Sequence, residues 1–366
     1  MSQPLSNILG YEAMLGVVER VKSGVPSDWL PPAYLRPTKT VPGHTAQYTR
    51  VDGTRTLAQQ VVYGAPSKRM GQEGVTKVPV GLIHTFHDIL HETTTLMQVM
   101  DLNNEARQNM GMQEVDRQTG QFFRKLRDLR VSTVASALAL GAIYFDGDGN
   151  LLPSSSGAKL SIDFGVPAGN KTQLDILGDG SIIDASWATA GTDIVGQCTE
   201  IKRSMLKKSG WQPTTAFYGA NIPGYLSTNT SFTSIIRSNP AVADSFKRGV
   251  IPPDTAGLNW VPGGDAFYVD ADGTIQSWIG DDTVVFAPDP SPDWWQFLEG
   301  TYPVPTDLGA ITETAIQQMG SIQEVAGFFS YCKVLDNPVT IQQFAGDTFL
   351  PLIASPYAVA IADVTP

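Results

Sequence analysis

The stretch Met112–Ala142, MQEVDRQTGQFFRKLRDLRVSTVASALALGA, has the longest helical pattern in the chain. Its apolar residues recur at steps close to three or four, which places them on one side of a helix. That apolar side consists of Val115, Phe122, Leu126, Leu129, Val134, Ala137 and Leu140. The opposite side consists of Arg117, Gln121, Arg124, Asp128 and Ser132. We therefore expect a helix with one buried side and one charged or polar side.

This helix should also be long and uninterrupted. No proline falls within it, and Gly120 costs about 1 kcal/mol relative to alanine. Gly141 and the turn-forming run Asp146–Asn150 mark its end. At a rise of about 1.5 Å per residue the helix would measure about 45 Å, whereas a mean globular helix has about 11–12 residues. These properties predict a strut.

The composition indicates a loop-rich α+β protein. The chain has 366 residues, enough for two domains, with 17% charged residues, 35 glycines and 25 prolines. A net charge of −11 argues against general nucleic-acid binding, which needs a basic surface. Two cysteines make no disulfide scaffold, and neither a signal peptide nor a membrane-spanning run is evident. We expect a soluble protein made in a reducing cytoplasm.

Charge is distributed unevenly along the chain. Residues 249–332 contain twelve Asp and Glu and neither Lys nor Arg, so this segment has a charge of −12. Because the whole chain has a net charge of −11, the remaining residues together carry +1. Such a stretch is most often a solvated face, and it would repel a phosphate backbone. Residues 50–77 are the opposite, with five basic and two acidic residues. We expect a positive loop on a negative protein.

Two N-terminal segments are too extended to form a core of their own. A proline-rich arm runs to residue 43 and has Trp29 as a large apolar anchor. Two β-like runs follow in residues 44–79, with Asp52-Gly53 as a hairpin signal. A two-stranded ribbon alone is only marginally stable. We therefore expect the arm and the ribbon to lie on a neighbouring molecule.

Further elements are predicted from periodicity and turn residues. A helical or turn-rich segment is expected at 80–100, and a helix at 186–208 that ends at Gly210. Another helix is expected at 222–229. The expected strands are 159–164, 172–177, 215–218, 259–261, 266–269, 274–279, 283–286 and 357–362. The last of these is apolar on both faces and should be buried in a sheet.

The strongest metal candidate is the set His84, His87 and His91. On a helix, these spacings would place three imidazoles on one side, and histidine is a common zinc ligand. The alternative is that the neighbouring apolar residues bury the helix while the histidines face water. A second histidine four residues after the His91-Glu92 pair is missing, so this is not the metalloprotease motif. We regard histidines that face water as a better interpretation than a metal site.

Other motifs fall short of an active site. Gly165–Thr172 lacks the glycine that a phosphate loop needs before its lysine. Asp146–Asn150 opens like a calcium loop, but Leu151 replaces the glycine of its sharp turn. The chain has no Gly-x-Ser-x-Gly nucleophile elbow. Cys198 lies on the apolar side of its predicted helix and is best read as a small core residue. We therefore predict no catalytic residue, no cofactor and no metal.

Several short motifs occur in an order that is specific over about two hundred residues, although none is decisive alone. They are Gly111–Glu114, Ala137–Ile143, Asp146-Gly147, Ile162–Gly165, Trp187 with Asp193-Ile194, Ser209–Pro213, Gly219–Leu226, Gly263-Gly264 to Gly273, Leu350–Leu352 and Pro356–Ala358. This order resembles the major capsid protein E family of tailed phages, the lambda-like group with the Hong Kong 97-type fold.

The resemblance implies an α+β capsid fold in four parts. They are an N-terminal arm (1–43), an extended loop or ribbon (44–82), a peripheral domain (83–183 plus 336–366) that holds the long helix, and an axial domain (184–335). The chain would be a major capsid protein whose hexamers and pentamers form the icosahedral head of a double-stranded DNA phage. The expected intersubunit contact residues are Trp29, Arg55, Lys68, Arg69, Lys77, Arg117 and Arg124.

The resemblance also implies partners and a location. The chain would contact neighbouring capsomers, a scaffold or protease, the portal and, where the head has one, a decoration protein. It would enclose DNA without sequence-specific binding, and it would not contact membrane. Assembly would take place in the host cytoplasm, and the product would be the virion. The alternative is a cytosolic metal-dependent hydrolase that uses His84, His87 and His91, and a phage-tail or other self-assembling module is a third hypothesis.

Overall fold

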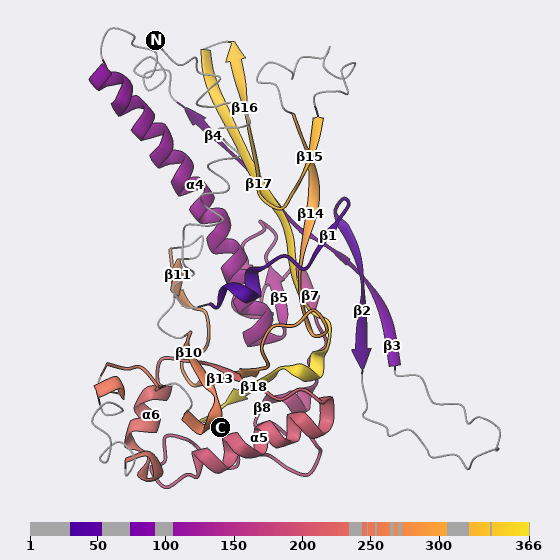
Figure 1. The fold of residues 1–366 in the computed structure, drawn as a ribbon, viewed down its shortest axis with the longest axis vertical. Coiled ribbons are helices and arrows are strands. Elements are labelled where there is room, and N and C mark those ends of the chain that lie inside the picture. Colours follow the sequence, from indigo (N-terminus) through magenta and orange to yellow (C-terminus); the bar gives the residue numbers. More distant parts are fainter. Residues whose placement is uncertain are drawn as a thin grey trace, which may run out of the picture.

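The computed structural model describes residues 30–52, 74–91, 105–233, 244–246, 248–252, 255–263, 267–269, 273–305, 322–336 and 339–365. Its elements form two main sheets and a projecting ribbon (Figure 1). The long helix α4 runs beside the six-stranded sheet, and the five-stranded sheet with helices α5 and α6 lies at the other end of the molecule (Figure 1). Within the described residues, no helix combines the length and apolar character needed to cross a bilayer.

Helix α4 spans Glu105–Leu140, 36 residues. It therefore starts seven residues before the predicted Met112 and is about 54 Å long. Its end lies at Gly141, as predicted, because this residue has a φ of +67°. A Cβ at Gly141 would also lie 2.7 Å from Cγ2 of Val166, so both backbone and space require glycine there.

The six-stranded sheet is organised around β17 (Val339–Ile353), its longest strand. Antiparallel neighbours of β17 are β16 (Phe329–Asp336), β4 (Ile83–His91) and β14 (Trp295–Pro305). Strand β14 extends the sheet further to β1 (Lys39–Val41) and β15 (Ile322–Ala326). Residues from both ends of the chain thus share one sheet beside α4.

The five-stranded sheet has the order β10 (Asn259–Pro262), β9 (Thr215–Tyr218), β13 (Thr283–Ala287), β18 (Ala360–Asp363) and β8 (Lys171–Thr172). Alternate residues of its strands enter two different cores. Tyr218 and Phe286 pack with α5 (Ile194–Ser209) and α6 (Ile222–Thr228), whereas Phe217 and Val285 pack with the core beside α4. A sheet covered on both faces explains why β18 is apolar on both sides.

Smaller elements complete the fold. The ribbon pairs β2 (Thr45–Asp52) with β3 (Gly74–Gly81), and it projects to one side of the body (Figure 1). Its base is packed on the subunit, because Ala46 and Tyr48 belong to the core beside α4. The remaining strands are β5 (Ala142–Phe145), β6 (Leu151–Leu152) and β7 (Leu160–Asp163) in one sheet, and β11 (Phe267–Val269) with β12 (Ile275–Ser277) in another.

Three sequence predictions are wrong. Residues 83–91 form a strand instead of part of a helix, because β4 completes its hydrogen bonding along β17. Helix α5 begins at Ile194, eight residues after the predicted start, because the Asp193 side chain accepts a hydrogen bond from the Gly196 amide and caps it. The predicted strand at 172–177 is reduced to β8, because Thr172 and Leu174 have φ values of +61° and +56°.

Candidate assembly surfaces and the junction that supports them

The ribbon displays one of the seven expected contact residues within the described chain. Lys77 lies on β3 opposite Thr49 and is exposed. Trp29, Arg55, Lys68 and Arg69 lie outside the described residues. The structure therefore places the ribbon's described positive charge on a projection whose base is anchored in the subunit core.

The first half of α4 displays the other two expected contact residues. Arg117 and Arg124 are both exposed and lie two helical turns apart on the same side. Arg117 forms an ion pair with Glu114 at 2.6 Å. The hydrogen bond from Arg117 lowers the pKa of Glu114 to about 2, with a further hydrogen bond from Gln118. The charged side is therefore partly neutralised around Arg117.

The second half of α4 differs from the prediction, because Ser132 is buried. All residues from Arg130 to Ala139 except Ser136 are buried. The hydroxyls of Ser132 and Thr133 donate to the carbonyls of Asp128 and Leu129, four residues earlier, at 2.7 and 2.6 Å. These bonds satisfy the hydroxyls inside the helix, so polar side chains can enter a buried surface.

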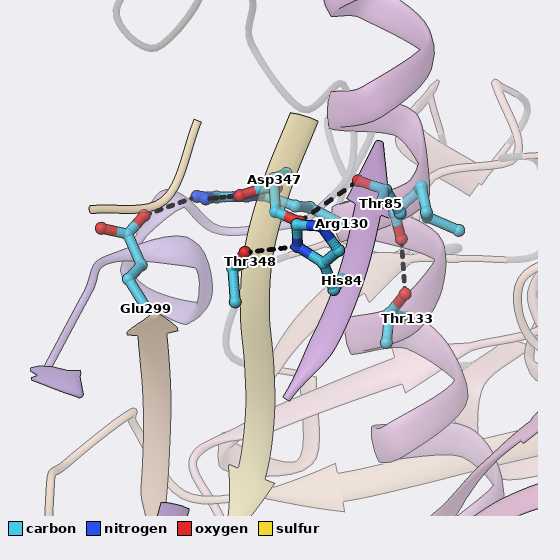
Figure 2. Close-up of polar contacts among 8 residues, drawn as sticks. His84, Thr85, Arg130, Thr133, Glu299, Asp347 and Thr348 are labelled. Carbon is cyan, nitrogen blue, oxygen red and sulfur yellow. Dashed lines mark hydrogen bonds and ion pairs between the residues drawn. The ribbon is translucent and has the colours of Figure 1, made fainter. Parts of the chain in front are cut away.

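Arg130 joins this buried half of α4 to the six-stranded sheet (Figure 2). Its guanidinium donates through Nε and Nη2 to both carboxylate oxygens of Asp347 on β17, and through Nη1 to Oε1 of Glu299 on β14 at 2.8 Å. All three side chains are nearly or fully buried. The paired carboxylates outweigh burial and raise the pKa of Arg130. A bidentate ion pair with Asp347, together with the ion pair to Glu299, therefore fixes the position of α4 on the sheet.

Aromatic and glycine residues complete this junction. The guanidinium carbon of Arg130 lies 3.9 Å from the ring centre of Phe328 and 5.3 Å from those of Phe297 and Phe349. A Cβ at Gly327 would lie 2.5 Å from Oε1 of Glu299, so a larger residue would collide with the ion pair. Our sequence analysis missed this junction. Its detectable signal was Asp347, the only charged residue in the stretch 339–353, and Arg130, the last charged residue before the apolar end of the helix.

The three histidines of the metal hypothesis do not converge. Residues alternate between the two faces of strand β4, so His84 points away from the face that holds His87 and His91. His91 is buried, with its ring nitrogens 3.1 and 2.9 Å from the side-chain oxygens of Gln118 and Gln343. In the described part of the chain, no group of three His, Cys, Asp or Glu could hold a metal ion. The helical spacing argument is therefore wrong.

His84 instead belongs to the place where the ribbon joins the body. Its Nδ1 lies 2.8 Å from Oγ1 of Thr348, the residue after Asp347 on β17 (Figure 2). Its ring lies 5.0 Å from that of His44, and 5.3 Å from Tyr302 in a stacked arrangement. The Leu82 amide donates to the carbonyl of His44 at 2.9 Å. We call His44 and His84, with Thr348 and Tyr302, the ribbon root.

An aromatic surface extends from the ribbon root across the outer face of the six-stranded sheet. Phe86 on β4 is 40% exposed and stacks on Phe344 at 5.5 Å, and Tyr302 stacks on Phe329 at 4.2 Å. Gly346 lies beneath these rings, where a Cβ would be 2.4 Å from Phe329. This face is the one turned away from α4, because Asp347 and Thr348 point to opposite sides of β17.

The described residues offer little for catalysis. An open pocket at the start of α5 is lined by Asp179, Asp184, Asp193 and Glu200, and by neither histidine nor cysteine. Burial raises the pKa of both Cys198 and Cys332 to about 12. Both thiols are therefore protonated and shielded at neutral pH, as predicted for Cys198.

Comparisons with known proteins agree with this geometry. The model of the family described as phage major capsid protein E matches residues 12–320. No curated protein matches the sequence. Two solved structures share the fold at 11% identity. One is assigned as the capsid protein of a prophage in E. coli CFT073, with a TM-score of 0.55 over 98% of this chain and 99% of that chain. The other is a phage-related protein from Bordetella bronchiseptica RB50, with a TM-score of 0.50 over 95% of this chain and 96% of that chain.

The family match spans well over half of the chain, and the structural matches span nearly all of it. The fold is therefore the Hong Kong 97-type phage capsid fold that the sequence motifs predicted. The chain belongs to the phage major capsid protein E family.

Proposed function

We propose that this chain is the repeating subunit of an icosahedral phage head, built from its hexamers and pentamers around packaged double-stranded DNA. The observation that carries the proposal is the pairing of a rigid body with a projecting ribbon. The base of the ribbon is fixed in the core by Ala46 and Tyr48, whereas Lys77 further out is exposed. Such an element can bind a neighbour with defined geometry.

The shell contact we propose joins the ribbon and arm of one subunit to its neighbours. Trp29, Arg55, Lys68, Arg69 and Lys77 would meet acidic or apolar surface there, and Arg117 and Arg124 would border the path of a neighbouring ribbon. The charge distribution supports this, because residues 249–332 are acidic throughout while residues 50–77 are basic. Opposite charges on two copies would guide docking and its register.

We propose the four-part division of the chain with one adjustment. The boundaries remain 1–43, 44–82, 83–183 plus 336–366, and 184–335 for the arm, ribbon, peripheral domain and axial domain. Strand pairing favours counting β14, β15 and β16 with the peripheral domain, because they share the sheet of β17. It favours counting β18 with the axial domain, because β18 pairs with β13.

The proposed role is structural and not enzymatic. The proposed partners are a scaffold or protease, the portal and a decoration protein. DNA would be held without sequence preference, and the shell would not contact membrane. The acidic net charge of −11 supports weak adhesion to DNA. The shell would assemble in the host cytoplasm and persist in the virion.

Electron microscopy and light scattering of the full chain, expressed alone and with its phage's neighbouring head genes, test this proposal. We expect megadalton shells. A variant with Arg55, Lys68, Arg69 and Lys77 all changed to Gln should remain folded but yield fewer shells. Its matched control removes four positive charges elsewhere, by changing the exposed Lys159, Arg203, Lys207 and Lys208 to Gln, and should assemble normally. Only monomers or small oligomers under every condition would contradict the shell role, and normal assembly of the ribbon variant would contradict the contact.

A further inference from the structure

The ribbon root places two titratable rings just outside the two strands of the ribbon, β2 and β3. His44 immediately precedes β2, and His84 lies in β4 shortly after β3 ends at Gly81. Their ring centres are 5.0 Å apart in an edge-to-face arrangement. Both rings also approach Tyr302 of β14, at 6.4 Å from His44 and 5.3 Å from His84. The pair therefore lies at the hinge between ribbon and body.

Both rings are exposed, and the surroundings of His84 favour its neutral form. The His84 ring lies nearly parallel to the rings of Tyr302, Phe329 and Phe86, with centres 5.3, 6.3 and 6.4 Å away, and its Nδ1 contacts the Thr348 hydroxyl. The contacts that the described structure gives His44 and His84 include no carboxylate. Asp347 is turned to the other face and paired with Arg130, and Asp88 further along β4 accepts a hydrogen bond from Gln342. Two imidazolium ions here would repel each other without a counter-charge.

Strand β14 also packs closely against the segments that join the ribbon to the body. A Cβ at Gly300 of β14 would lie 2.4 Å from Thr348, 2.7 Å from Leu82 and 2.8 Å from the carbonyl of Gly43. The Gly43 amide donates to the Thr301 hydroxyl at 3.3 Å. The ribbon therefore leaves the body through a tight crossing, so a small separation of the two histidines would change its angle.

We propose that His44 and His84 form a proton-sensitive hinge that holds the ribbon in one orientation when both rings are neutral and frees it when both are protonated. Partial burial and the nearby His44 lower the pKa of His84 below its ordinary value of 6.5, in agreement with this geometry. Because the folded state disfavours the charged form of His84, protonating this ring costs folding free energy. That cost begins as the pH falls below the ordinary pKa of 6.5 and is complete once the pH is below the lowered pKa of the folded state. Its relevance to assembly rests on the proposed role of the ribbon.

Electron–electron distance measurements on the full chain test the hinge. Spin labels at Thr49→Cys on β2 and Glu324→Cys on β15 report the ribbon angle, since both positions are exposed and Thr49 lies beyond the anchored Tyr48. The native thiols of Cys198 and Cys332 are buried and should remain unlabelled. Labelled subunits are diluted in unlabelled ones, so distances arise within one subunit. We expect a shifted or broader distribution at about pH 5 than at about pH 8.

Three variants make the outcome specific. The double change His44→Gln/His84→Gln should keep the distribution of about pH 8 at both values, whereas His84→Arg should produce the low-pH distribution at about pH 8. His87→Gln, an exposed histidine on the other face of β4, should titrate like the wild type. The same distribution in the wild type at both pH values would overturn the hinge, as would a shift that survives in the double variant. Neither result depends on whether shells form, so each is distinguishable from a failure of the shell role.

Discussion

Residues 106–129 and 130–140 of α4 share one continuous backbone but have different surroundings. In the first part Phe122, Phe123 and Leu126 are buried, while Arg117 and Arg124 remain exposed. In the second part nearly every side chain is buried, including an arginine, a serine and a threonine. Residues of β4 and β17 pack against the buried side of the first part, whereas the second part shares one hydrophobic core with residues of β5, β18 and the segment Pro32–Leu35.

The second part of α4 anchors the helix in its own subunit, whereas the first part exposes charged side chains to solvent. Polar groups in the second part are satisfied internally, through Arg130 with its two carboxylates and through the hydroxyls that donate back to the helix. The first part keeps its charges in water, where they add little to stability. One helix can therefore be fixed to its own subunit at one end and present charge to a neighbour at the other.

The largest expected effect comes from breaking the anchor. Arg130→Ala leaves the buried carboxylates of Asp347 and Glu299 without their partner, and we expect a loss of about 3–5 kcal/mol of unfolding free energy. Urea denaturation of the purified subunit measures it. The triple change Arg130→Met/Asp347→Leu/Glu299→Met removes all three charges and should recover most of the loss. A loss below about 1 kcal/mol in Arg130→Ala would show that the ion pairs do not anchor the helix.

A larger side chain in the buried residues 130–140 of α4 tests how tightly this part of the helix is packed. Ala137 is fully buried, so Ala137→Leu should cost about 1–3 kcal/mol. The control Gln121→Leu places the same side chain on the exposed side of the first part and should stay within about 0.5 kcal/mol of wild type. Thermal and urea denaturation would measure both. Equal effects of the two leucines would contradict the asymmetry along α4.

Two glycines of the helix should respond in opposite directions. A Cβ at Gly120 meets nothing within 4 Å, so Gly120→Ala should stabilise the protein by about 1 kcal/mol. Gly141→Ala should destabilise it by at least as much, because of its positive φ and the contact with Val166. Denaturation midpoints of the two variants compare them directly. Stabilisation by both changes would show that Gly141 does not end the helix in the described conformation.

The smallest effect on stability should come from the displayed charges. Arg117→Gln removes an exposed ion pair and should leave the denaturation midpoint close to that of the wild type. Without this hydrogen bond, the pKa of Glu114 should rise from about 2 toward its ordinary 4.5, which carboxyl NMR shifts would follow. Arg117→Gln should lower the yield of shells clearly while it changes the denaturation midpoint little. A large loss of stability would place Arg117 in the anchor instead of on the display surface.

Much of the fold is predictable from local patterns. The spacing of Phe122, Leu126 and Val134 identified α4, and Gly210 correctly marked the end of α5. The strands predicted at 215–218 and 283–286 were also confirmed as β9 and β13, since short apolar runs bounded by turns identify buried strands. The family resemblance was confirmed by the match over residues 12–320. The domain boundaries and contact residues stay predictions.

Other features depend on partners distant in the sequence. The pattern of residues 83–91 permits either helix or strand, and pairing with β17 decides for a strand, which separates His84 from His87 and His91. Polarity also placed Ser132 on the outer side, whereas enclosure by the surrounding elements buries it.

The sequence by itself determined a long amphipathic helix, a basic two-stranded ribbon and strands with buried faces, because these follow from the spacing of neighbouring residues. Only the tertiary structure decided which charges are anchors. Arg130 and Asp347 are 217 residues apart, and nothing in the period of either segment encodes their contact. Their pairing arises because the sheet brings β17 against α4, where a buried charge is stable only beside its opposite.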